Sequence, residues 1–209
     1  MSIKVVLVDD HPLVLGGLEQ LLALGDDFQV LRTCGTAEEG YLAVMSDAPD
    51  VLVLDLMLPG ENGLSLLRRL DSTKPPAVII LTAMQDEDLL LDAARLGARG
   101  IVLKAQAPRT LEDCIRAVYN GERRLTVEGV DFSKRAAERQ QVEKELSGQL
   151  TPRELEIARL VALKLDNQEI ATRLSITIGT VKIHLHHVFD KLNVKGRREL
   201  QQLLRDRRY

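Results

Sequence analysis

Cysteine is scarce in this 209-residue chain, and its two cysteines, Cys34 and Cys114, lie far apart in the sequence. Their spacing is not that of a metal site, so we expect two reduced structural thiols. The sequence also contains no apolar run that approaches the length needed to cross a bilayer. Its first apolar stretch is too short for a signal peptide and runs directly into acidic residues. These absences favour a globular protein that works in the cytoplasm and has no membrane partner.

Charge is divided unevenly along the chain. Residues 1–128 contain 12 Lys and Arg against 20 Asp and Glu, a net −8, whereas residues 129–209 contain 16 against 11, a net +5. An acidic half joined to a basic half suggests two separate tasks, and nucleic acid is a candidate partner for the basic half.

The first 128 residues alternate short runs rich in Val, Ile and Leu with stretches of helical periodicity. The runs predict strands at 3–8, 28–34, 51–55, 77–82 and 100–103, and the periodic stretches predict helices at 12–23, 36–46, 62–71, 85–97 and 107–120. Nearly unbroken apolar strands are typical of a sheet that is buried on both faces. We therefore predict a parallel α/β sheet with helices on both sides.

Polar residues follow four of the apolar runs. Asp9 and Asp10 end the first run, Asp55 the third, Thr82 the fourth and Lys104 the last. The carboxyl ends of parallel strands lie along one edge, where ligands bind in open α/β sheets. Clustered carboxylates repel one another unless a cation lies between them, and oxygen ligands suit Mg²⁺. Each residue alone is common at a strand end, but the five together predict a Mg²⁺ site for phosphate chemistry.

Asp55 is the expected phosphoryl acceptor, because a carboxylate can attack phosphorus and form an aspartyl phosphate. The expected Mg²⁺ ligands are Asp9, acting through water, Asp10, Asp55 and the backbone carbonyl of Met57. We expect Lys104 to pair with one phosphoryl oxygen and the hydroxyl of Thr82 to donate a hydrogen bond to another.

The motifs V-V-L-V-D-D-H, V-L-V-L-D-L-M-L-P-G-E-N-G-L, I-I-L-T-A and G-I-V-L-K resemble those of the receiver domain of two-component response regulators. The resemblance covers residues 1–125 and implies a flavodoxin-like fold with a five-stranded parallel sheet. The site residues that it implies are the phosphoacceptor Asp55, the Mg²⁺-binding pair Asp9 and Asp10, and the switch and phosphate-binding residues Thr82 and Lys104. Receivers usually have Tyr or Phe three residues before the lysine, where this chain has Ile101. An aliphatic side chain cannot make the usual aromatic movement, so the switching detail stays open.

Residues 126–149 separate the two halves. From residue 129 onward they contain four basic and four acidic residues and few large apolar ones. We predict a charged helical linker with Ser133 as its cap, and a flexible tether remains the alternative.

Residues 150–209 predict an all-α domain of four helices. Capping boxes at 151–154 and 166–169 begin the first two helices, Thr177 precedes a third that runs to about residue 191, and a fourth covers about 196–207. The short turn S-I-T before the third helix predicts a helix-turn-helix, whose second helix enters the major groove of DNA. Helical periodicity alone would also fit a protein-binding module.

The segments T-V-K-x-H and K-L-N-V-x-x-R resemble the LuxR-type DNA-binding domain. The resemblance implies base contacts from Lys182, Ile183 and His186, and phosphate contacts from Thr180, Lys191 and Arg197. This chain departs from the family at His186, where Lys or Arg is common, and at Lys164, which replaces a usual glycine. The histidines at 184, 186 and 187 raise a metal site as an alternative, although no nearby Cys or acid completes the set.

Together the two resemblances imply a response regulator of the NarL/FixJ type. Such a protein would accept a phosphoryl group from a sensor histidine kinase, form a homodimer and bind double-stranded promoter DNA, with RNA polymerase as a further partner. We expect no enzyme activity beyond phosphorylation and dephosphorylation of its own Asp55.

Three other functions compete with this one. A haloacid-dehalogenase-like phosphatase is disfavoured, because Met57 stands where that family needs a second acid. An autoinducer-binding LuxR protein is disfavoured, because the first half has receiver landmarks. A DNA-binding regulator that uses its receiver only for phosphorylation-independent dimerisation remains the alternative.

Overall fold

The structure is a computed structural model that describes residues 2–70, 75–83 and 86–206. It divides into two compact units, Met1–Ala136 and Ala137–Tyr209. The main strands of the first unit are β1 (Ile3–Val8), β2 (Phe28–Cys34), β3 (Val51–Leu54), β4 (Ala77–Thr82) and β5 (Gly100–Leu103). Its helices are α1 (Pro12–Ala23), α2 (Ala37–Asp47), α3 (Gly63–Arg69), α4 (Glu87–Arg95) and α5 (Ala107–Tyr119), the last preceded by a 3₁₀ turn at Lys104–Gln106. No helix in the described part of the chain is both long and apolar enough to span a bilayer.

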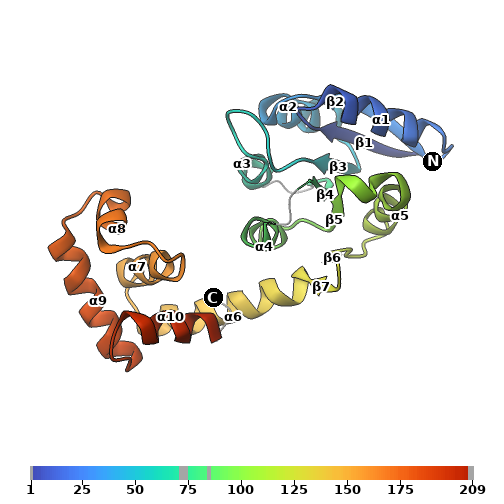
Figure 1. Ribbon diagram of the computed structural model, residues 1–209. Coiled ribbons are helices and arrows are strands. Elements are labelled where there is room, and N and C mark those ends of the chain that lie inside the picture. Colours follow the sequence, from blue (N-terminus) through green and yellow to red (C-terminus); the bar gives the residue numbers. More distant parts are fainter. Residues whose placement is uncertain (1, 71–74, 84–85, 207–209) are drawn as a thin grey trace. The chain divides into compact units, whose positions relative to one another are not determined.

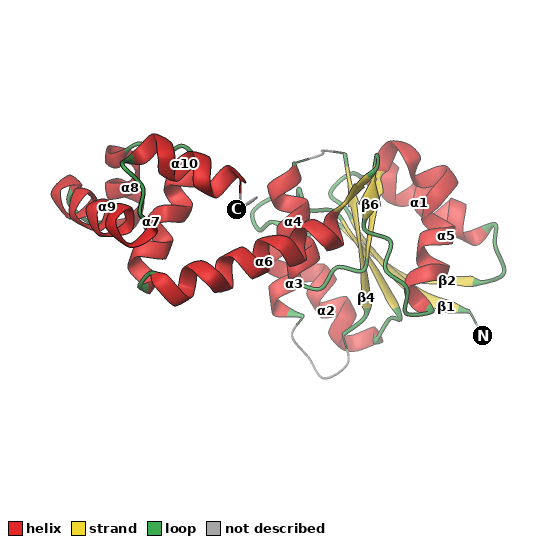
Figure 2. Ribbon diagram, turned by 90° about the horizontal axis from the view of Figure 1, so that it is seen from below, coloured by secondary structure: helices red, strands yellow, loops and turns green. Residues whose placement is uncertain are grey.

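The five strands form one parallel sheet in the order β2-β1-β3-β4-β5 (Figure 1). Helices α1 and α5 cover one face, and α2, α3 and α4 cover the other (Figure 2). Successive side chains of a strand point to opposite faces, so Val5 and Leu7 pack beneath the first pair while Val6 and Val8 pack beneath the second group. Full burial of each such side chain contributes about 1.5–3 kcal/mol. The predicted flavodoxin-like fold is confirmed.

Three helices begin later than the sequence predicted, because a polar side chain at or near the predicted start caps the helix from outside it. Thr36 accepts a hydrogen bond from the backbone N–H of Glu39, and Asn62 accepts one from Ser65. Asp86 in the same way accepts two bonds at the start of α4. The predicted boundaries at residues 71, 85 and 207 lie outside the described residues. The predicted strand 51–55 ends at Leu54, which leaves Asp55 in the loop beyond it.

A short hairpin that the sequence did not predict follows α5. Strands β6 (Thr126–Val127) and β7 (Val130–Asp131) pair antiparallel around Glu128 and Gly129, which both have positive φ, as a tight hairpin turn requires. Helix α6 (Phe132–Gln149) then begins. Its first turn is capped by the Asp131 carboxylate, which accepts hydrogen bonds from the backbone N–H groups of Ser133 and Lys134. The predicted cap, Ser133, instead donates its N–H and its hydroxyl to that carboxylate.

The two ends of α6 contribute to different cores. Phe132 and Ala136 lie in the core of the first unit, whereas Leu146 and, just beyond the helix, Leu150 lie in the core of the second. The second unit also contains α7 (Pro152–Ala162), α8 (Asn167–Leu174), α9 (Ile178–Leu192) and α10 (Arg197–Asp206). Both predicted capping boxes are formed, at Thr151 with Glu154 and at Asp166 with Glu169.

Candidate functional site

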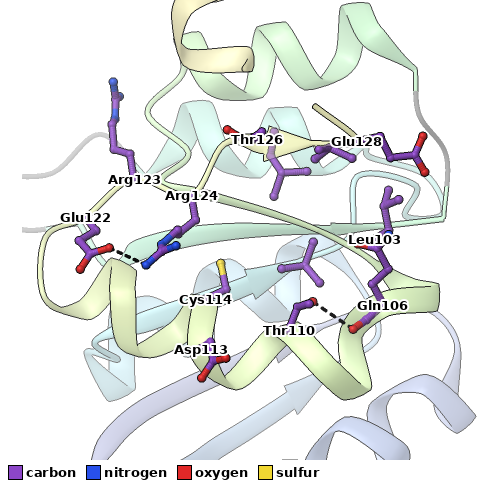
Figure 3. Close-up of a pocket in the computed structure, with 13 residues that line it drawn as sticks. Leu103, Gln106, Thr110, Asp113, Cys114, Glu122, Arg123, Arg124, Thr126 and Glu128 are labelled. Carbon is purple, nitrogen blue, oxygen red and sulfur yellow. Dashed lines mark hydrogen bonds and ion pairs between the residues drawn. The ribbon is translucent and has the colours of Figure 1, made fainter. Parts of the chain in front are cut away.

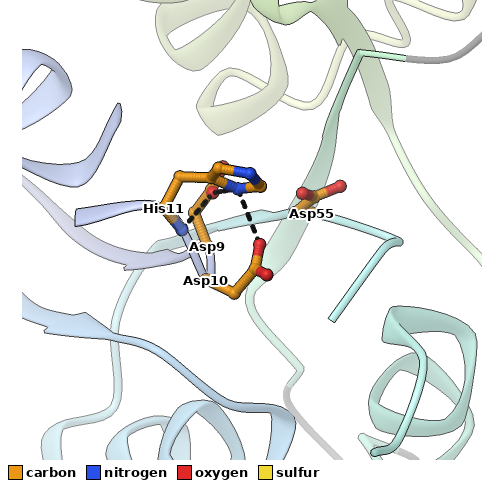
Figure 4. Close-up of side chains that lie close together, drawn as sticks. All are labelled: Asp9, Asp10, His11 and Asp55. Atoms are coloured by element: carbon orange, nitrogen blue, oxygen red, sulfur yellow. Dashed lines mark hydrogen bonds and ion pairs between the residues drawn. The ribbon is translucent and has the colours of Figure 1, made fainter. Parts of the chain in front are cut away.

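The strand register brings carboxylates together at one edge of the sheet. Val8 pairs with Leu54, so the residues that follow them, Asp9 and Asp55, leave neighbouring strands side by side. The backbone N–H of Asp55 donates to the carbonyl of Val8 at 2.9 Å, which holds the ends of the two strands together. One ligand atom each from Asp9, Asp10, His11 and Asp55 lies within 4.8 Å of the others (Figure 4).

Lys104 lies against the buried side of this cluster. Its Nζ is 2.6 Å from Asp9 Oδ2 and 2.7 Å from Asp55 Oδ2, and both carboxylates are almost fully buried. Burial by itself lowers the pKa of the Lys104 ammonium, but hydrogen bonds and charges from Asp55 and Asp9 outweigh burial and raise that pKa above its usual value. Three carboxylates and one ammonium have a net charge of −2. A divalent cation would balance this charge, and the carboxylate oxygens are suitable ligands for it.

The other residues predicted for this site lie at the same edge. Thr82 is the last residue of β4 and is buried, and its register partner is Leu103, the residue before Lys104. The backbone N–H of Met57 donates to Asp55 Oδ1 at 3.0 Å, so it orients the carboxylate. The structure therefore brings all the predicted receiver-site residues to one edge of the sheet.

Close packing fixes the loop after Asp55. The backbone N–H of Gly63 donates to the carbonyl of Leu56 at 3.0 Å. A Cβ at Gly63 would lie 2.3 Å from the carbonyl oxygen of Asp55 and 2.9 Å from the Cα of Leu56. Only glycine fits at this position, because the backbone of Asp55 and Leu56 passes directly against it.

In the second unit, α9 presents a polar face opposite its buried one. Val181, Leu185 and Val188 lie in the core, which fits the predicted amphipathic spacing. The three residues expected to contact bases, Lys182, Ile183 and His186, are all exposed. The left-handed conformation of Ser175 ends α8, and the side chain of Thr177 caps α9. Helices α8 and α9 thus form the helix-turn-helix that the sequence predicted.

The three residues expected to contact phosphates also make bonds within the unit. The hydroxyl of Thr180 lies 2.9 Å from that of Thr177, and Lys191 Nζ lies 2.6 Å from Glu154 Oε2. The guanidinium of Arg197 donates to the side-chain oxygen of Asn167 at 2.8 Å and to the backbone carbonyl of Leu165. Each of these side chains therefore also holds the fold together, whatever its part in DNA binding.

Comparison with known proteins assigns both units. Residues 5–116 match the family model of the response regulator receiver domain, and residues 148–204 match that of the bacterial regulatory proteins of the luxR family. The chain belongs to the response regulators. Both resemblances inferred from the sequence are confirmed, and the protein is a DNA-binding transcriptional regulator of a two-component system.

Relatives of this response regulator are similar along nearly their whole length. The oxygen regulatory protein NreC of Staphylococcus carnosus (strain TM300) is 35% identical over 204 residues, with 94% of each chain covered. The nitrate/nitrite response regulator protein NarL of Escherichia coli (strain K12) is 34% identical over 198 residues, which cover 93% of this chain and 91% of that one. A solved structure of RcsB from Salmonella typhimurium is 26% identical, covers 98% of this chain and 100% of its own, and has a TM-score of 0.61.

Two residues that lie at the candidate sites of this response regulator were not predicted from the sequence. His11 Nδ1 lies 2.7 Å from Asp10 Oδ1 and 3.1 Å from Asp9 Oδ1, and its place directly after two acids was the available signal. Glu154 is buried, although the sequence showed it only as part of a capping box. Burial would raise the pKa of Glu154, but hydrogen bonds from Lys191 and Thr151 lower it to about 2.

The α9 histidines belong to no set of three metal-binding side chains in the described part of the chain. Among the described residues, the group at Asp9, Asp10, His11 and Asp55 is the only set of three or more metal-binding side chains within reach of one ion. His186 Nε2 lies 3.5 Å from Asp190 Oδ2 one helical turn away, which is an ordinary surface pair.

Ile101, which replaces the usual aromatic residue of receivers, is buried and borders a pocket of about 660 Å³ (Figure 3). Strand β5, the 3₁₀ turn after it, helix α5, and residues 122–124 and 126–128 line this pocket. Part of its polar surface is paired internally, since Arg124 bonds Glu122 and the hydroxyl of Thr110 donates to the backbone carbonyl of Gln106. Burial raises the pKa of the Cys114 thiol to about 11, so this cysteine offers no nucleophile at neutral pH.

Proposed function

We propose that this response regulator binds promoter DNA in a manner that depends on phosphorylation of Asp55 by a sensor histidine kinase. The observation that carries the proposal is the position of Lys104, whose ammonium touches the carboxylates of both Asp55 and Asp9. An ammonium in this position can pair with a phosphoryl oxygen as soon as Asp55 carries one.

In the proposed step, a carboxylate oxygen of Asp55 attacks phosphorus, a P–O bond forms, and the P–N bond to the kinase histidine breaks with its electron pair going to that nitrogen. Lys104 neutralises one phosphoryl oxygen, and the hydroxyl of Thr82 donates to another. Bound Mg²⁺, held by Asp9, Asp10, Asp55 and the backbone carbonyl of Met57, would offset the charge of the transferring group. We expect no other enzyme activity, because the position two residues after the acceptor is Met57 and supplies no general acid.

The added charge at Asp55 gives the switch its physical basis. Once Lys104 and Thr82 contact the phosphoryl group, Lys104 is drawn away from Asp9. This movement shifts the end of β5 and the start of α5 toward a second conformation. We propose that this shift promotes a homodimer, whose two α9 helices occupy half-sites about one helical turn apart on DNA. Solved complexes of the related RcsB contain DNA, in one case with two RcsB dimers. RNA polymerase at the bound promoter and a cytoplasmic location belong to the same proposal.

Intact-mass measurement after incubation with acetyl phosphate and Mg²⁺ tests the phosphorylation. The wild type is expected to gain the mass of one phosphoryl group, and Asp55→Asn is expected to gain none. Glu61→Gln, a partly exposed acid in the same loop, is the matched control and should be modified like the wild type.

The DNA-binding half of the proposal is tested by genome-wide mapping of bound DNA with and without the phosphodonor. Occupancy is expected to rise in the wild type and to stay constant in Asp55→Asn. Equal occupancy and equal self-association in both proteins would instead favour the phosphorylation-independent regulator.

A further inference from the structure

We propose that His11 is a nitrogen ligand of the cation site and makes that site prefer first-row transition-metal ions to Mg²⁺. This inference rests on the proposed function, because it assumes that a divalent cation binds among the three carboxylates. It concerns a residue that lies outside the set of oxygen ligands named above, and it changes which cation the receiver is expected to hold.

The position of His11 is the first argument. Its Nδ1 atom faces the carboxylates and belongs to the group of four side chains whose ligand atoms lie within 4.8 Å of one another (Figure 4). The backbone N–H of His11 donates to Asp9 Oδ1 at 2.9 Å, which fixes the main chain from which the imidazole projects. His11 is also the cap residue of α1, yet its side chain makes no capping hydrogen bond, so the ring contacts the carboxylates of Asp9 and Asp10 rather than the start of the helix.

The distribution of exposure is the second argument. Lys104 approaches Asp9 and Asp55 from the buried side, where the side-chain exposure of these acids is only 1% and 3%. Asp10 and His11 form the open side, with exposures of 31% and 63%. A cation entering from solvent therefore meets His11 and Asp10 first, and the ammonium of Lys104 does not stand between them.

The chemistry of the donor set gives the direction of the preference. Mg²⁺ takes oxygen ligands, whereas an imidazole nitrogen suits the later first-row ions. In the structure, Nδ1 lies at hydrogen-bond distance from Asp10, whose carboxylate can only accept, so Nδ1 carries the hydrogen there. A neutral imidazole can carry that hydrogen on Nε2 instead, and Nδ1 then offers a lone pair to a metal ion. Three carboxylates and one imidazole form a mixed set that strengthens binding from Mn²⁺ toward Co²⁺ more than an oxygen-only set does.

Titrating the untagged full-length protein with Co²⁺ and, separately, with Mg²⁺ tests the inference by calorimetry. Proton NMR of the Co²⁺-loaded protein adds a direct readout, because the exchangeable N–H of a Co²⁺-bound imidazole is shifted far outside the normal range. We expect such a resonance in the wild type and none in His11→Gln. We also expect His11→Gln to lower the ratio of Co²⁺ to Mg²⁺ affinity at least about tenfold, as loss of a metal-site group commonly does. His187→Gln, an exposed histidine of the other unit, is the control and should keep both properties.

The outcomes separate this inference from the proposed function. If the wild type binds both ions but shows no shifted imidazole resonance, or if His11→Gln keeps the same affinity ratio, His11 is not a ligand while the acidic site stands. If the wild type binds neither ion, the inference and the metal-assisted phosphorylation both fail. A ratio that falls only in His11→Gln, together with loss of the resonance, supports the inference.

Discussion

Replacing Glu154 with glutamine should loosen the hold of α7 on the recognition helix α9. The Glu154 carboxylate accepts the backbone N–H of Thr151 at 2.8 Å and pairs with Lys191 at 2.6 Å. It is thus a helix cap and an interhelical ion pair at once, in a position where its side chain is only 4% exposed. Glutamine keeps the size and one acceptor oxygen but has no charge to offer Lys191.

The pKa of Glu154 sets the size of the effect. That pKa falls from its ordinary 4.5 to about 2, which corresponds to at most about 3.5 kcal/mol at about 1.4 kcal/mol per pKa unit. Hydrogen bonds to charged groups contribute about 1.5–3 kcal/mol in mutational series. We therefore expect Glu154→Gln to lower the free energy of unfolding of the second unit by about 1.5–3 kcal/mol at pH 7.

The pH dependence has a definite sign. Because the folded-state pKa lies below the unfolded value, the stabilisation is fully present above about pH 4.5 and is lost as the pH falls through about 2. The difference in stability between the wild type and Glu154→Gln should therefore be constant at neutral pH and shrink progressively in acid.

Urea titration followed by methyl NMR of Val181 and Leu185 measures the stability of this unit alone, because both side chains lie in its core. Glu156→Gln is the control, since Glu156 is an exposed residue of the same helix and pairs with Arg153 at the surface. Such pairs contribute about 0–1 kcal/mol. If Glu154→Gln is no less stable than Glu156→Gln at pH 7, or if the difference persists unchanged at pH 2, the assigned role of Glu154 is wrong.

Three further predictions concern backbone fit and the extent of the first core, and each is measured by urea unfolding. Gly63→Ala should destabilise the receiver by about 1–3 kcal/mol or more, because the new Cβ meets the carbonyl of Asp55, whereas Gly16→Ala, in open space within α1, should stabilise it by up to about 1 kcal/mol. Lys164→Gly should stabilise the second unit by about 1 kcal/mol, since Lys164 has a φ of 63°, and Lys164→Ala should bring no such gain. Phe132→Ala should destabilise the receiver by about 3–5 kcal/mol, because Phe132 is buried in its core, and an unchanged receiver would refute that placement.

The fold of the first unit was predictable because the apolar runs of the strands alternate with the helical periodicity of the helices, as a parallel sheet with crossover helices requires. The apolar runs gave the strands within one residue, and the parallel order then forced Asp9 and Asp55 to the same edge. The hairpin at 126–131 was not predicted, because strands of two residues are too short to show an alternation of apolar and polar residues. The missing glycine at Lys164 was visible in the sequence, but only the structure shows that this lysine adopts the left-handed conformation.

Candidate sites differ in predictability for a physical reason. Backbone topology positions the receiver carboxylates, so their assembly follows from where each strand ends. Backbone topology does not decide between competing partners of a long, flexible side chain, and the sequence therefore could not show that Lys191 pairs with Glu154 or that Arg197 bonds Asn167.

The competition between Glu154 and DNA phosphates for Lys191 also affects how DNA would bind. An exposed lysine such as Lys182 would approach DNA at the cost of its own ordering alone, and each phosphate that a lysine neutralises releases counterions. Lys191 must also leave Glu154, and a buried carboxylate without its cation is strongly unfavourable. We therefore expect Lys191 to contact DNA only while its ammonium stays paired with Glu154. The contact would use one of the ammonium N–H groups that does not donate to Glu154. Affinity at this position then depends on the geometry that Glu154 imposes, whereas the exposed Lys182 is the charge on α9 that should respond most directly to salt.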